Sequence, residues 1–180
     1  KSYQHSDVYV IAPDGSGVQN LTANFDRSID AIAWRPDGRA LVGQTEVDGI
    51  LTLVSIDLSG NVRNLVSDIG GTSLGRPYAS GSFSVASKAG GSSPMIAYTK
   101  GSSNRPAEVA LTRGSGNGRQ LTRLNEDALG RLDLARIEEI KVASTHDGRE
   151  IEAWVALPPN FRPDGTFPMI LEIHGGPNTM

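Results

Sequence analysis

The fold is decided by residues 167–177, which read FPMILEIHGGP. The run from Pro168 to Ile173 is short and mostly apolar, which predicts a β-strand covered on both faces. Glu172 interrupts this run and needs a hydrogen-bonding partner if it is buried. The strand leads directly into the tetrapeptide HGGP at 174–177. Because glycine lets a backbone approach closely, this tetrapeptide is a candidate for a ligand-facing loop.

A β-hairpin is predicted just before this strand. Residues 137–144 and 150–157 alternate in polarity around Asp147-Gly148, which is a strong signal for a β-hairpin. His146 lies beside that turn and is expected to be solvated, as is His5 near the start of the chain. The glutamates of the two strands have basic neighbours, so we interpret them as solvated ion pairs rather than as an acid–base pair. These are Glu138, Glu139, Glu150 and Glu152.

Residues 1–124 consist of short alternating runs separated by turn-forming dipeptides, which predicts antiparallel strands. Three runs resemble one another, and each follows a strand and a Gly, Asn or Ser turn; they cover residues 18–22, 62–66 and 119–123. Their spacing is near the roughly 40–50 residues of a four-stranded propeller blade, with an insertion over residues 67–82. A β-sandwich is the alternative, but its turns recur at shorter intervals.

The turn at Trp34-Arg35-Pro36-Asp37-Gly38-Arg39 also favours a propeller. It is similar to the aromatic-x-Pro-Asp-Gly turn between inner strands of TolB-like and prolyl-oligopeptidase-like blades. Pro presets φ in such a turn, and Asp and Gly accept the tight bend. We therefore expect Trp34 to be packed between strands and Pro36-Asp37-Gly38 to form the turn.

Taken together, the order of these parts resembles the prolyl-oligopeptidase family of serine peptidases, nearest its acylaminoacyl-peptidase and dipeptidyl-peptidase branches. The specific match covers about residues 137–177. The resemblance implies a mainly β chain: a partial β-propeller of about three blades over residues 1–124, a linker with a helical turn over 125–136, and the first strands of an α/β-hydrolase domain over 137–180.

The same resemblance implies a role for the HGGP loop. Acyl transfer builds negative charge on the substrate oxygen, and α/β-hydrolases stabilise it with two backbone N–H groups. One of these comes from the loop after the third strand, so the resemblance implies an oxyanion loop at His174, Gly175 and Gly176, with Gly176 as the donor. The triad follows in the order Ser, Asp, His. We expect all three beyond Met180, so residues 1–180 alone are expected to be inactive.

Composition limits the other classes of function. The net charge of −3 without a basic block gives no sign of nucleic-acid binding, and no run of residues reaches the length of a membrane span. The chain has no Cys, and its His residues are far apart, so neither a cofactor nor a metal is expected. A peptide substrate and the remainder of the parent chain are the expected partners. Localisation stays open between cytoplasmic and periplasmic or secreted.

Two rivals remain beside a serine peptidase that cleaves short peptides or acyl-peptides through an acyl-enzyme intermediate, with the propeller gating access. The first rival is a TolB-like propeller that acts only as a binding module, with an unrelated hairpin after it. The second is an esterase on the same scaffold. Exopeptidase or endopeptidase preference cannot be read from these residues.

Overall fold

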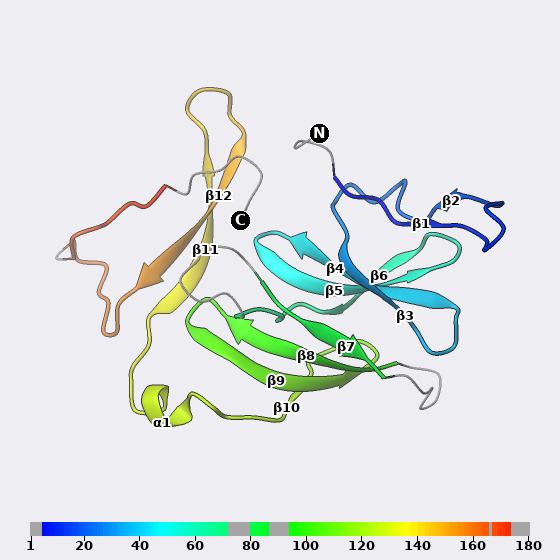
Figure 1. Cartoon of the computed structure of the whole chain (residues 1–180). Helices are drawn as coiled ribbons and strands as arrows, with labels where there is room; N and C mark the ends of the chain where they lie inside the picture. The colour runs from blue at the N-terminus through cyan, green and yellow to red at the C-terminus, as the bar shows by residue number, and fades with distance from the viewer. Residues whose placement is uncertain (1–4, 72–79, 87–93, 166, 174–180) are drawn as a thin grey trace.

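The computed structural model describes residues 5–71, 80–86, 94–165 and 167–173. These residues form two four-stranded antiparallel sheets, two two-stranded ladders and one short helix (Figure 1). The helix, α1 (Glu126–Leu129), has four residues and lies within the predicted linker. The prediction of a mainly β chain is confirmed.

The first sheet shows how local sequence chemistry sets the register. It has the order β3 (Asp30–Trp34), β4 (Ala40–Val47), β5 (Ile50–Asp57) and β6 (Val62–Val66). Asp48 and Gly49 join β4 to β5, with φ values of 49° and 67°. Two left-handed residues in a row form the hairpin turn whose twist matches that of the strands. Val47 therefore pairs with Ile50, and the ladder runs from there to Ala40 and Asp57.

The second sheet repeats this arrangement. It has the order β7 (Phe83–Val85), β8 (Met95–Ser102), β9 (Arg105–Arg113) and β10 (Arg119–Gln120). A separate ladder pairs β1 (Tyr9–Val10) with β2 (Gln19–Asn20). The three similar sequence runs form β2, β6 and β10, which are the last strands of their respective sheets. The sequence repeat is thus a structural repeat, while the number of propeller blades stays a prediction.

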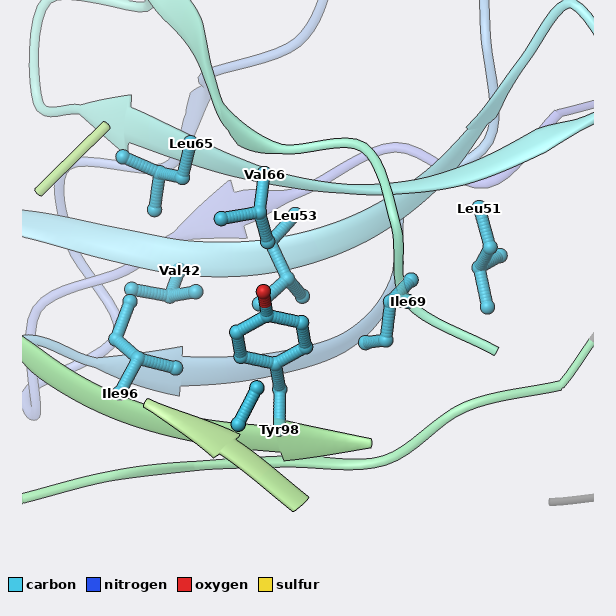
Figure 2. Close-up of a cluster of buried hydrophobic side chains, with 9 residues drawn as sticks. Val42, Leu51, Leu53, Leu65, Val66, Ile69, Ile96 and Tyr98 are labelled. Atoms are coloured by element: carbon cyan, nitrogen blue, oxygen red, sulfur yellow. The ribbon is translucent and has the colours of Figure 1, made fainter. Parts of the chain in front are cut away.

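The main core lies between the two four-stranded sheets. Leu53, Val42 and Val66 of the first sheet and Ile96 and Tyr98 of the second are almost fully buried in it. Figure 2 shows the Tyr98 ring pointing from β8 toward the leucine and valine side chains of the facing sheet. Side chains of two separate sheets therefore share one hydrophobic core, as those of neighbouring blades do.

The hydroxyl of Tyr98 retains a partner inside this core. It donates a hydrogen bond of 2.8 Å to Oδ1 of Asp68, whose Oδ2 lies 2.7 Å from Nζ of Lys100. Burial, and then Asp68, raise the pKa of Tyr98 above its usual range. The tyrosine therefore remains neutral, and its polar end costs little to bury.

A carboxylate and a threonine hold the last strand against its neighbour at two equivalent places. Thr22 Oγ1 accepts a hydrogen bond from the Val8 N–H at 2.9 Å and donates one to Asp7 Oδ1 at 3.0 Å. In the second sheet, Thr122 Oγ1 accepts from the Val109 N–H at 2.8 Å and donates to Glu108. We call each such pair a carboxylate–threonine clamp. The clamp satisfies a backbone N–H where the ladder ends.

The Glu108 clamp has further partners that stabilise the charged carboxylate. The backbone N–H groups of Leu124 and Asn125 donate to it at 2.9 and 3.1 Å, and the Asn125 amide donates at 2.9 Å. The Thr122 hydroxyl, followed by the Leu124 N–H, lowers the pKa of Glu108 from 4.5 to about 2. The carboxylate therefore stays ionised in the fold under conditions where it is protonated in the unfolded chain.

This shift predicts a pH dependence of stability. A carboxyl whose folded pKa is depressed stabilises the fold above its unfolded pKa, and this contribution declines as the pH falls through the window from 4.5 to about 2. Glu108→Gln should lower the free energy of unfolding at neutral pH. It should also reduce the further decrease in that free energy as the pH falls from 4.5 to about 2. Urea unfolding at stepped pH measures both effects, with the exposed Glu150→Gln as control. If the free energy of unfolding of Glu108→Gln falls with decreasing pH as steeply as that of the parent protein, Glu108 is not the source of this pH dependence.

The predicted hairpin and the predicted Pro-Asp-Gly turn are both confirmed. Strands β11 (Arg136–Ala143) and β12 (Glu150–Leu157) pair along their whole length around the predicted turn, where Gly148 has a φ of 74°. Pro36-Asp37-Gly38 forms a tight turn in which the Gly38 N–H donates to the Arg35 carbonyl at 3.0 Å. Short-range turn chemistry alone determines both features.

The expectation for Trp34 is wrong. Its side chain is half-exposed, at 50%. Side chains project from the faces of a sheet, and the described residues leave half of the Trp34 surface uncovered. The turn motif determines the backbone, but the surrounding sheets determine the burial of the aromatic ring.

The expectation of a buried strand at 168–173 is also wrong. This segment forms no β-strand, and Met169, Ile170, Leu171 and Ile173 are 73–93% exposed. Glu172 is exposed as well, so it needs no buried partner. A strand needs a neighbour with which to form a ladder, and none of the described residues pairs with this segment.

Candidate functional site

The predicted oxyanion loop lies outside the described residues. His174, Gly175 and Gly176 all fall in this part of the chain, so their role stays a prediction. The two histidines that were expected to be solvated are exposed. His146 lies at the β11–β12 turn, and His5 lies 3.6 Å from Asp7 and 4.0 Å from Asp26.

The sequence also contains a serine-centred pattern within residues 1–180, where the expectation above placed no nucleophile. Residues 71–75 read GTSLG, which matches Gly-x-Ser-x-Gly with Ser73 at its centre. Residues 72–79 lie outside the described part. The pattern falls between β6 and β7 and precedes the HGGP loop by about a hundred residues, whereas the nucleophile of an α/β-hydrolase follows that loop and sits between a strand and a helix. Ser73 therefore matches the sequence motif of a nucleophile but does not have the position in the chain that the nucleophile of an α/β-hydrolase has.

A hollow of about 310 Å³ lies where the first sheet meets the hairpin β11–β12. Its lining comes from the segment before β3, from β3 and β4, from the β4–β5 turn and from β12. Its polar and charged lining residues are Arg27, Ser28, Asp30, Glu46, Asp48 and Glu152. Four of these six are carboxylates, so the hollow is strongly acidic.

One cation offsets part of this negative charge. Arg27 lies 3.4 Å from Oδ1 of Asp48 and donates a hydrogen bond of 3.4 Å to the backbone carbonyl of Glu46. Burial, together with the nearby Asp30, raises the pKa of Glu46. Burial also raises the pKa of Glu152, and Glu139 and Asp48 add to the effect. Glu152 therefore faces Glu139 and Asp48 in addition to its expected basic neighbour Lys141, whose charge opposes the rise in its pKa.

A close contact adjoins the hollow. A Cβ built on Gly49 would overlap atoms Cζ2 and Cη2 of the Trp154 ring, so the indole packs directly against the glycine. Sequence patterns could not have found this contact, because Gly49 and Trp154 lie about a hundred residues apart. The sequence signal was limited to the Asp48-Gly49 turn itself.

The described residues offer no complete catalytic machinery. Ser28 is the hydroxyl-bearing residue of the hollow, and no histidine lines the hollow beside it. In the described ranges, no three His, Asp or Glu side chains come together in a way that holds a metal ion. No helix in the described part has the length and hydropathy of a membrane span. The arrangement can hold two parts of the chain together.

Comparisons with known proteins give a consistent fold. No family model matches the chain. A curated relative, an uncharacterized peptidase, YuxL, of Bacillus subtilis (strain 168), is 34% identical over 77 residues, which are 43% of this chain and 12% of the relative. An acylaminoacyl peptidase of Pyrococcus horikoshii matches 86% of the chain with a TM-score of 0.60 and 20% identity.

Two further solved structures agree with this result. An acylaminoacyl peptidase in complex with Z-Gly-Gly-Phe-chloromethyl ketone covers 89% of the chain, with a TM-score of 0.57 and 19% identity. The AtxE2 isopeptidase with bound Astexin3-dC4 covers 88%, with a TM-score of 0.57 and 15% identity. This chain spans only 21–23% of the length of these structures. At the level of the fold, the resemblance to the prolyl-oligopeptidase family is confirmed.

Proposed function

We propose that this chain, which has the fold of acylaminoacyl peptidases of the prolyl-oligopeptidase family over most of its length, is part of a serine peptidase. One observation carries the proposal. Two core-sharing β-sheets are followed by a hairpin, and this fold matches acylaminoacyl peptidase structures over 86–89% of the chain. The HGGP tetrapeptide follows the hairpin in the sequence. The 34% identity to a peptidase over part of the chain supports it independently.

The proposed reaction is acyl transfer to a serine. A serine Oγ attacks the carbonyl carbon of the peptide while a histidine takes its proton, and the carbonyl oxygen becomes an oxyanion. The C–N bond then breaks, and the amine leaves with that proton. Water hydrolyses the resulting ester. In this scheme the backbone N–H of Gly176 is one of the two donors to the oxyanion.

The proposed substrates are short peptides or acyl-peptides. In this proposal the sheets of residues 1–124 are blades of a propeller that restricts access to the active site, so that large folded proteins are excluded. The shared core between the two four-stranded sheets supports this part of the proposal, because neighbouring blades bury such cores against each other.

The position of the nucleophile gives the first test. A fluorophosphonate probe should label a single Ser in the full-length protein, outside residues 1–180, and Ser73→Ala should leave that labelling intact. Residues 1–180 expressed alone should remain unlabelled. Peptide mapping by mass spectrometry identifies the labelled residue. Loss of labelling in a folded Ser73→Ala protein would overturn the placement of the catalytic machinery.

Substrate turnover separates the remaining alternatives. Hydrolysis of an acyl-peptide with a higher kcat/KM than that of a p-nitrophenyl ester supports the peptidase. The reverse preference indicates an esterase on the same scaffold. A full-length protein that neither reacts with the probe nor turns over either substrate sinks the enzyme proposal and leaves the propeller as a binding module.

A further inference from the structure

The hairpin β11–β12 contacts the first sheet through the β4–β5 turn. Figure 1 shows this turn, in cyan, extending toward the hairpin, in yellow and orange. The contact is direct, because the Trp154 ring occupies the space that a Cβ of residue 49 would fill. The two parts therefore meet at a contact that a change of one residue can alter.

The turn is held in a conformation that suits this contact. Both Asp48 and Gly49 have left-handed φ values. The Arg27 guanidinium lies 3.4 Å from the Asp48 carboxylate and donates a hydrogen bond of 3.4 Å to the Glu46 carbonyl. Glycine at position 49 serves two purposes, since it accepts the positive φ and leaves room for the indole. The turn is thus a fixed surface against which β12 lies.

Charges on the two sides of this contact are mostly alike. The first sheet contributes three carboxylates, and the facing side of the hairpin contributes two. The five are Asp30, Glu46, Asp48, Glu139 and Glu152. Two cations face them: Arg27 from the sheet, and Lys141, which pairs across the hairpin with Glu152. Carboxylates therefore outnumber cations. When all of them are ionised, the first sheet and the hairpin repel each other.

We propose that the contact between the β4–β5 turn and β12 is a pH-responsive latch, in which the Trp154–Gly49 packing tightens when the facing carboxylates take up protons. Apolar packing holds the two parts together, and the like charges beside it oppose that packing. Protonation removes the repulsion and leaves the packing. This latch does not depend on the reaction proposed above, since it concerns only how the two parts of the chain are joined.

The direction of the pH effect follows from the two glutamates. Burial and like-charged neighbours raise the pKa of both Glu46 and Glu152 in the docked arrangement. A carboxyl with a raised pKa binds more protons in the docked state than in the open state. The hairpin therefore packs most tightly against the first sheet below the ordinary pKa of glutamate. This packing weakens as the pH rises through the raised pKa values of Glu46 and Glu152.

Fluorine NMR of the full-length protein labelled with 5-fluorotryptophan tests the latch, with the Trp154 resonance assigned from Trp154→Phe. From about pH 8 down to about pH 4, the Trp154 resonance should shift with a midpoint above the ordinary glutamate value of about 4.3. Glu46→Gln and Glu152→Gln should reduce this shift and hold the resonance near its low-pH position. Glu138→Gln, on the opposite side of the hairpin, should leave the titration unchanged.

A second variant tests the contact itself. Gly49→Ala should move the Trp154 resonance toward its solvent-exposed position at every pH, because the added methyl group displaces the ring. The proposal is overturned if the Trp154 resonance does not titrate in the parent protein, or if it titrates in both Gln variants as it does in the parent. An unshifted resonance in Gly49→Ala also overturns it, since the ring then does not lie on residue 49. Circular dichroism verifies that each variant is folded.

Discussion

Gly176→Val in the full-length protein should lower kcat by about 10²–10³-fold, or roughly 3–4 kcal/mol of transition-state stabilisation. The proposed reason is that the Gly176 N–H donates to the oxyanion and that its missing side chain leaves room for the substrate carbonyl. Valine misplaces that donor. The ground-state carbonyl uses the donor weakly, so KM should change much less than kcat. Steady-state hydrolysis of an acyl-peptide measures both constants.

A matched control protects this result from misinterpretation. His146 is exposed at the β11–β12 turn, so His146→Ala should leave kcat within about twofold of the parent value. Both variants must show native circular dichroism and native thermal unfolding, because loss of fold would imitate loss of catalysis. A folded Gly176→Val enzyme with near-native kcat would show that Gly176 is not an oxyanion donor.

Leu53→Ala should lower the free energy of unfolding by about 2–5 kcal/mol. Leu53 is fully buried at 0% exposure in the core between the two four-stranded sheets, near Ile96 and Tyr98 (Figure 2). Truncation removes apolar contacts and leaves a cavity that two rigid sheets cannot close. Urea unfolding followed by circular dichroism measures the change.

The control for this prediction is a leucine of the same chain outside the core. Leu58 follows β5 and is 44% exposed, so Leu58→Ala should change the free energy of unfolding by no more than about 0.5 kcal/mol. Equal destabilisation by both variants would mean that the two sheets do not share a core at Leu53.

Features set by neighbouring residues could be predicted from the sequence. Asp48-Gly49 and Asp147-Gly148 each mark a hairpin, because Asp48, Gly49 and Gly148 take a left-handed backbone that few residues accept. Pro36-Asp37-Gly38 sets its own turn in the same way. The repeat over β2, β6 and β10 was also visible, since each copy follows the same kind of turn. These features need no knowledge of distant parts of the chain.

Features set by distant residues could not be predicted. The apolar run at 168–173 has the composition of a buried strand, but a strand also needs a pairing partner, and a single segment does not reveal one. The hollow beside Trp154 depends on contacts across about a hundred residues. Its carboxylates therefore looked like ordinary surface charges in the sequence. The exposure of Trp34 has the same cause, because burial depends on what packs against the face from which the side chain projects.

The carboxylate–threonine clamps also bear on how the chain assembles during synthesis. Each clamp joins residues only 14 or 15 positions apart, Glu108 to Thr122 and Asp7 to Thr22. A link this short closes a small loop, so its entropic cost is low and it forms before contacts between remote segments. The outer pair of strands in each such unit can therefore close soon after leaving the ribosome, before the next sheet is available to cover it.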